Sequence, residues 1–115
     1  MCIRDRYYTL HNTITLLREK ARESYNKVRL ERHNYYTGKA SAEVYAEDPF
    51  PYKIREKDTL QKYLEADEKL SAIDLKIKYY DVMLKFLEDI IKTIANRTYQ
   101  IKNAIEWHRF QAGFN

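Results

Sequence analysis

Residues 70–105, LSAIDLKIKYYDVMLKFLEDIIKTIANRTYQIKNAI, carry an unbroken heptad pattern that decides the fold of this chain. This spacing predicts one long helix with a single apolar stripe, which must be covered in water. A chain of 115 residues has few other elements to offer, so a second copy of the chain is the expected partner. All stripe positions except Thr98 are apolar or aromatic: Leu70, Ile73, Ile77, Tyr80, Leu84, Leu87, Ile91, Ile94, Thr98, Ile101 and Ile105.

The composition limits the classes of protein to which the chain can belong. Only two Gly and two Pro occur, so the turn residues of a multi-stranded sheet are nearly absent and an all-α fold is predicted. No stretch approaches the roughly 20 apolar residues of a membrane span, and no signal peptide is recognisable. A cytoplasmic protein is therefore expected. The single cysteine, Cys2, excludes an internal disulfide framework.

The sequence divides into four segments of one predicted domain. Residues 1–6, MCIRDR, fit no helical pattern and are interpreted as a non-native scar. Residues 7–38 form a basic helix with a pattern that runs from about Tyr8 to Thr37, because Gly38 suits a helix C-terminus. Residues 39–52 contain both prolines and are predicted to be a loop.

The last segment, residues 53–115, is predicted to be a helical hairpin or bundle element that ends in the long heptad helix. Two interpretations remain open near its middle. Either a new helix begins at Ser71, with Asp74 as the acidic residue of a capping box, or one helix continues through this point.

A second apolar stripe accompanies the main heptad at Tyr79, Met83, Phe86 and Ile90. A helix with two such stripes is too apolar for a two-stranded coiled coil, so burial on two sides is expected, by its own hairpin partner and by a neighbouring subunit. Trp107 adds a large apolar ring near the chain end, which we assign to the subunit contact. The predicted oligomerisation residues are Leu87, Ile91, Ile94, Ile101, Ile105, Trp107 and Phe110.

The first helix carries a basic and aromatic stripe about 90° round from its apolar face, at roughly 100° per residue. Guanidinium groups bind phosphates and phenol rings stack on bases, so the stripe predicts single-stranded nucleic-acid binding. A solvated basic face is the alternative, and Glu19 and Glu23 would then neutralise part of it. Residues 1–40 carry a net charge of +5, whereas residues 41–75 carry −4. The stripe residues are Arg18, Arg22, Tyr25, Arg29, Arg32 and Tyr36.

No motif indicates catalysis, a cofactor or a metal. His11, His33 and His108 lack the paired spacing of a helical metal site. The sequence contains no glycine-rich phosphate loop and no nucleophile elbow. A non-enzymatic protein is therefore predicted.

Three blocks in the same order resemble the UvsY family of recombination mediators from T4-type bacteriophages. They are Asn34 to Gly38 (NYYTG), residues 64–84 (LEADEKLSAIDLKIKYYDVML) and residues 97–113 (RTYQIKNAIEWHRFQAG). The likeness runs from about Arg29 to Gly113.

The resemblance implies a ring-like homo-oligomer that binds single-stranded DNA in an infected bacterial cell. It also implies two protein partners, because such mediators help a RecA-like recombinase to replace the single-strand-binding protein on DNA. A basic pair ahead of the Tyr-Tyr turn is tied to DNA binding in the family. Arg32 stands at its second position, whereas Leu30 occupies the place of the first, a lysine, beside Arg29.

Two alternatives remain for the chain. One is a helical oligomeric scaffold or adaptor protein with no nucleic-acid role, whose basic face is merely solvated. The other is a membrane-surface protein with a basic amphipathic helix, which the absence of Trp and Phe from the first helix disfavours.

Overall fold

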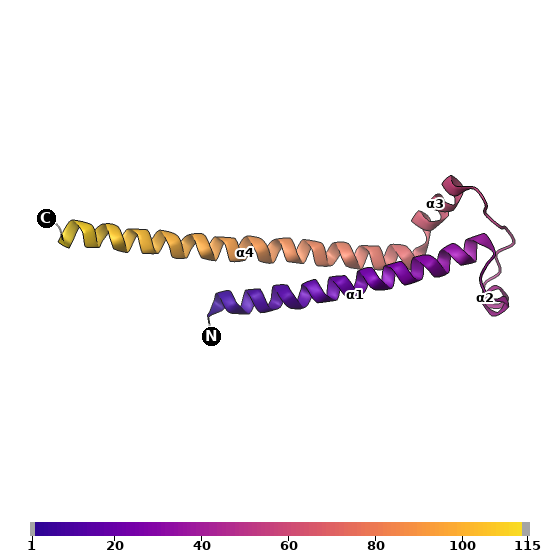
Figure 1. The fold of residues 1–115 in the computed structure, drawn as a ribbon, viewed down its shortest axis with the longest axis horizontal. Helices are drawn as coiled ribbons and strands as arrows, with labels where there is room; N and C mark the ends of the chain where they lie inside the picture. The colour runs from indigo at the N-terminus through magenta and orange to yellow at the C-terminus, as the bar shows by residue number, and fades with distance from the viewer. Residues whose placement is uncertain (1, 114–115) are drawn as a thin grey trace. The chain divides into compact units, whose positions relative to one another are not determined.

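The computed structural model describes residues 2–113, and all of the regular structure in this part of the chain is helical. The predicted all-α fold and long C-terminal helix are confirmed. Residues 2–113 contain four helices in sequence (Figure 1): α1 (Ile3–Thr37), α2 (Ala42–Glu47), α3 (Lys57–Ala66) and α4 (Glu68–Gly113). Met1, Phe114 and Asn115, which belong to the predicted terminal segments, lie outside the described residues.

The chain forms two compact units. One combines the residues up to Thr15 with those from Asp81 onward. Its buried side chains are Ile14 of α1 and the heptad residues Leu84 and Leu87 of α4. The start of α1 thus packs on the middle of α4, and the predicted apolar stripe supplies the contact.

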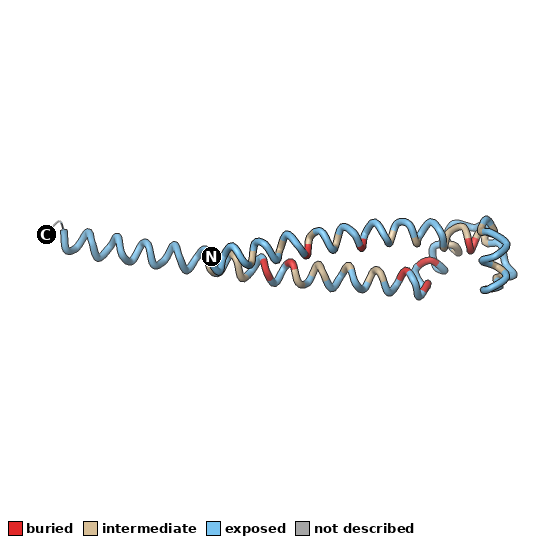
Figure 2. The backbone as a smooth tube through the Cα atoms, turned by 90° about the horizontal axis from the view of Figure 1, so that it is seen from below, coloured by how far each residue is buried: buried red, intermediate tan, exposed pale blue. Residues whose placement is uncertain are grey.

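The C-terminal part of α4 is exposed along its whole described length. Every residue from 95 to 113 is exposed, as the continuous pale blue of this segment shows in Figure 2. Ile101 and Ile105 are 56% and 55% exposed although they continue the heptad.

The second unit, Leu16–Tyr80, contains the last part of α1, all of α2 and α3, and the start of α4. Its core consists of Tyr35, Tyr36, Leu64 and Leu70. Tyr45 of α2, the loop residue Phe50 and residues of α1 and α3 pack around this cluster. Aromatic rings from the Asn-Tyr-Tyr-Thr-Gly turn therefore form the centre of the unit.

Several helix bounds differ from those that the sequence pattern indicates. Helix α1 begins at Ile3 rather than near Tyr8, so residues 3–6 of the predicted scar are helical. The predicted loop contains the six-residue helix α2, and α3 begins at Lys57 rather than near Lys53. The residues just before α3 are not helical, and there the backbone N–H of Ile54 donates to the Tyr36 carbonyl at 3.0 Å. A hydrogen bond to α1 thus replaces an extra turn of α3.

The helix break lies at Asp67, four residues before the candidate position Ser71. Asp67 ends α3 in an extended conformation, and its Oδ1 accepts a hydrogen bond from the Leu70 N–H at 3.1 Å. This is the bond that an N-cap residue makes to the third helical position. The interpretation with two helices is therefore correct, with a different capping residue.

Helix α1 ends in a Schellman motif, as Gly38 predicts. Gly38 has a φ of +82°, and its N–H donates to the Tyr35 carbonyl at 3.4 Å. The N–H of Lys39 donates to the Asn34 carbonyl at 2.8 Å. The Tyr45 hydroxyl also donates to the Tyr35 carbonyl, at 2.8 Å. The last carbonyls of α1 thus hold the following loop in place.

We expect the substitution Gly38→Ala to lower the free energy of unfolding by about 1–2 kcal/mol, because a residue with a Cβ is strained at positive φ. Urea unfolding followed by helical circular dichroism measures this change. Gly113→Ala is the matched control, because a Cβ there meets no atom within 4 Å. Equal unfolding midpoints for the two variants would contradict the proposed role of the turn.

Candidate nucleic-acid interface

The predicted basic stripe runs from the surface towards the core. The side chains of Arg18 and Arg22 are 25% and 51% exposed, and Arg29 is also exposed. The Arg32 side chain is only 13% exposed, and Tyr36 is 8% exposed. The stripe residues lie on one face of α1, but their exposure differs along the helix. Side chains of the loop and of α3 surround the last turns of this face.

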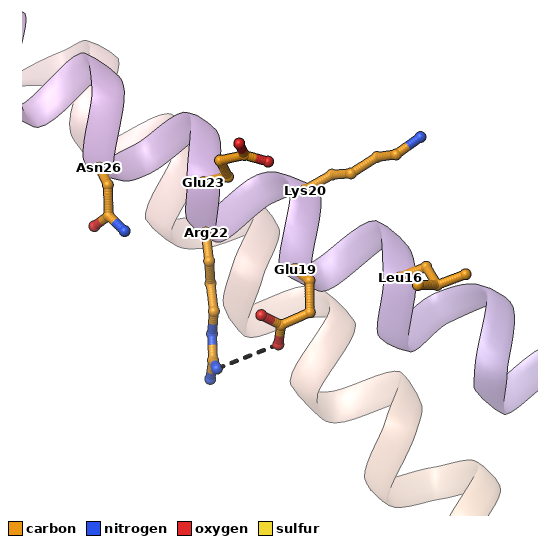
Figure 3. A pocket seen from close by; sticks show the side chains of 6 residues that line it. All are labelled: Leu16, Glu19, Lys20, Arg22, Glu23 and Asn26. Atoms are coloured by element: carbon orange, nitrogen blue, oxygen red, sulfur yellow. Dashed lines mark hydrogen bonds and ion pairs between the residues drawn. The ribbon is translucent and has the colours of Figure 1, made fainter.

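Glu19 lies between the first two arginines. Its Oε1 atom is 3.6 Å from Nη2 of Arg18 and 3.5 Å from Nη1 of Arg22. Figure 3 shows Arg22 reaching towards Glu19, while Lys20 points away from both. The Arg22–Glu19 pair is exposed, and pairs of this kind contribute only about 0–1 kcal/mol to stability.

A groove of about 560 Å³ occupies the same part of α1. Its charged lining is balanced, with two cations and two acids, so this groove does not concentrate positive charge. The lining residues are Leu16, Glu19, Lys20, Arg22, Glu23 and Asn26. Lys20 and Lys27, which the predicted stripe omits, are exposed cations of the same helix.

Tyr25 is half-buried and packs against the core cluster of its unit. It lines a small cavity of about 140 Å³ together with residues of α3 and α4, among them Leu64, Leu70 and Asp74. Only part of its ring surface is available for contact with a base.

Arg32 and Tyr36 meet the carboxylate of Asp67 inside the second unit. The Arg32 Nε and the Tyr36 hydroxyl both donate to Asp67 Oδ2 at 2.6 Å. The Arg32 guanidinium also lies over the Tyr35 ring, 4.2 Å from its centroid. In this arrangement the two predicted DNA-binding residues hold α1 to the α3–α4 corner, and the Tyr36 ring has no exposed face on which a base could stack.

The protonation states in this cluster follow from burial and hydrogen bonding. Burial opposes ionisation of Asp67, but donors from Tyr36, Leu70 and Arg32 outweigh it and lower its pKa. Burial, together with the hydrogen bond to Asp67, raises the pKa of the Tyr36 hydroxyl. Because the Asp67 pKa is lower in the folded state than in the unfolded state, its contribution to stability is full at neutral pH. That contribution is lost as the pH falls through the folded-state pKa.

Within residues 2–113, no group of three or more His, Cys, Asp or Glu side chains is placed to hold a metal ion. No helix in the same range has an apolar stretch long enough to cross a membrane. The fold and the surface together define a helical protein with a basic face on its first helix.

The family assignment comes from the sequence of nearly the whole chain. A family described as "Recombination, repair and ssDNA binding protein UvsY" matches residues 2–114. The chain belongs to this family. It is also 27% identical over 92 residues to the "Recombination protein uvsY" of Enterobacteria phage T4, which covers 79% of this chain. The chain spans 64% of the length of that relative. No solved structure is significantly similar to this chain.

We expect Arg32→Ala to lower the free energy of unfolding by about 3–5 kcal/mol, because it leaves the buried Asp67 carboxylate without its cation. Urea unfolding measures this loss. Arg29→Ala removes an exposed guanidinium three residues away and should change stability by no more than about 0.5 kcal/mol. Equal stability of the two variants would show that the buried ion pair does not hold the corner.

Proposed function

We propose that the chain is a non-enzymatic recombination mediator that binds single-stranded DNA as a homo-oligomer. In the infected bacterial host it would help a RecA-like recombinase to displace the single-strand-binding protein from DNA. The observation that carries this proposal is the family match over residues 2–114. The relative's printed name, a recombination protein, supports the same process.

The exposed cations of α1 support the DNA-binding part of the proposal. Lys20, Arg22, Lys27 and Arg29 are all exposed on this helix, and the phosphate backbone is the main source of affinity for such proteins. We assign phosphate contacts to Arg22 and Arg29 first, because their guanidinium groups are accessible. Arg18 and Tyr25 are half-buried and contribute at the edge of the same face. Arg32 does not contact DNA in this proposal; its ion pair with Asp67 holds this part of α1 in position.

Removal of single guanidinium groups tests the DNA face. We expect the log affinity of the wild-type chain for a thymine oligonucleotide to fall linearly with log salt concentration. Arg29→Ala should weaken binding and reduce this slope by about 0.7, the value for one lost phosphate contact on a single strand. Fluorescence anisotropy over a salt series measures both quantities.

Lys85→Ala is the control for loss of charge, because Lys85 is an exposed cation of α4 rather than α1. It should leave the salt slope unchanged. Binding by the wild type that does not depend on salt would favour the scaffold alternative. An unchanged slope for Arg29→Ala would place the DNA face elsewhere on the protein.

The exposed end of α4 supports the assembly part of the proposal. Beside Ile101 and Ile105, this segment exposes Tyr99 (65%), Trp107 (59%) and Phe110 (56%). Large exposed apolar side chains in such number along one helix end mark an interaction site. We assign this site to further copies of the chain, because Ile101 and Ile105 continue the heptad whose members Leu84 and Leu87 are already buried within the subunit.

Ile101→Asp combined with Ile105→Asp should convert the oligomer to monomers or small species that remain helical. Two carboxylates in a subunit contact cost several kcal/mol, whereas in the monomer both side chains are already exposed. Apparent DNA affinity should also fall by about 10²–10⁴, because linked weak sites act together. Analytical ultracentrifugation and the anisotropy assay measure the two effects.

The paired change of both isoleucines to leucine is the control, because it keeps the apolar contact. It should preserve the oligomer and the DNA affinity. A full-size oligomer in the aspartate variant would refute the proposed interface. An unfolded chain would instead place the two isoleucines in a core within the subunit.

A further inference from the structure

Two tyrosine rings beyond the predicted stripe remain exposed beside the core of the second unit. Tyr52 is 67% exposed and Tyr63 is 41% exposed. Both rings meet the half-buried Phe50 edge to face, with centroid distances of 5.9 Å and 6.0 Å. The same phenylalanine thus supports both rings, while much of their surface stays accessible. Rings that are held before binding lose less conformational freedom when a ligand arrives.

The segment that carries these rings is rich in cations, although residues 41–75 as a whole are acidic. Residues 52–62 contain four cations and only two acids, and all four cations are exposed: Lys53, Arg55, Lys57 and Lys62. Within residues 2–113, none of these cations forms an ion pair with a carboxylate. The acids that make the middle of the sequence negative lie before and after this segment.

The position of the segment is fixed by contacts to α1. The N–H of Ile54 donates to the last-turn carbonyl of Tyr36 at 3.0 Å. The Lys53 stem passes so close to Gly38 that a Cβ there would lie 2.9 Å from the Lys53 Cγ. Tyr63 is held in turn by Tyr36, at 5.5 Å between ring centroids. The cations and the rings are therefore presented together by one packed corner.

Cations beside accessible rings match the two parts of a single strand. Phosphates bind the cations, and unpaired bases stack on the rings, irrespective of sequence. We propose that Tyr52 and Tyr63 are base-stacking residues of the single-strand site and that Lys53 and Arg55 contact its phosphates. This inference rests on the proposed DNA-binding function. It assigns the stacking role to rings that the sequence stripe did not include, next to the buried Tyr36.

The positive charge of the segment favours a nucleic acid over a second copy of the chain as the occupant. An apolar protein contact would have to bury Lys53 and Arg55, which border Tyr52 on its C-terminal side, without a partner of opposite charge. A flexible polyanion satisfies them and covers the rings in the same step.

The test compares two oligonucleotides of equal length, one of thymidines and one of abasic sites. Tyr52→Ala should weaken binding to the thymine strand about 5- to 150-fold, which corresponds to the loss of one stacked base. Affinity for the abasic strand should not change, because that strand has phosphates but no bases. Tyr52→Trp keeps a stacking ring and should retain the affinity of the wild type for both strands. Tyr63→Ala should behave like Tyr52→Ala, provided that circular dichroism shows an unchanged helix content.

Each alternative has a distinct result. Unchanged affinity of Tyr52→Ala for thymidines, or an equal loss on both strands, would overturn the stacking assignment while leaving the proposed function intact. A wild-type chain that binds neither strand would overturn the proposed function itself. A change in oligomer size for Tyr52→Ala, measured by ultracentrifugation without DNA, would show that a second copy covers this ring and would also overturn the assignment.

Discussion

The carboxylate of Asp67 is the constraint on which the second unit depends. It is 5% exposed, forms an ion pair with a residue of α1 and accepts hydrogen bonds from α1 and α4. One oxygen caps α4 through the Leu70 N–H, and the other is shared by Arg32 and Tyr36 of α1. Transfer of a carboxylate from water to the protein interior is costly, so Asp67 is buried only when its hydrogen-bond partners are present together. The direction of the chain between α3 and α4 and the position of α1 are thereby fixed by the same residue.

This constraint separates supporting residues from contact residues on α1. A guanidinium that is held by a buried carboxylate and packed on Tyr35 cannot also reach far into solvent. Arg22 and Arg29 have no such restriction, because both are exposed. The consequence for mutagenesis is direct: loss of DNA binding after a change at Arg32 would not by itself identify a DNA contact. A change at Arg29 tests contact with less structural disturbance.

The sequence predicted those parts of the fold that local chemistry decides. The heptad gave α4 from about Leu70 onward, and Gly38 gave the end of α1. The sequence pattern did not predict α2, because six residues have little helical stability of their own. In the structure, Tyr45 ties this segment to the end of α1. The sequence pattern offered Ser71 as the helix cap, whereas the structure uses Asp67. Both residues have side chains that can cap a helix, so local sequence does not distinguish them. The choice depends on Arg32, which lies 35 residues away in the sequence.

The candidate site was predictable to a smaller degree for a related reason. Helical spacing correctly placed Arg18 to Tyr36 on one face, but spacing does not reveal which neighbours cover that face at each turn. Phe50 and α3 cover its last turn, and only the folded chain shows this. The exposed rings of Tyr52 and Tyr63 had a weak signal in the sequence, a tyrosine next to alternating cations at residues 52–55. That signal was hidden by the net negative charge of the surrounding segment.

The exposed end of α4 also constrains any self-association. At roughly 100° per residue, Trp107 and Phe110 lie about half a turn away from the face of Ile101 and Ile105. A single neighbouring helix covers one of these faces and leaves the other in water. Burial of both requires that each subunit makes contacts through two different faces, which a heterologous arrangement provides. Such contacts either continue as a filament or close into a ring, and only closure leaves no apolar face exposed. Any assembly through α4 links several copies of the basic α1 face, so the apolar pattern that decides the fold of α4 would also supply the multivalency on which the proposed function relies.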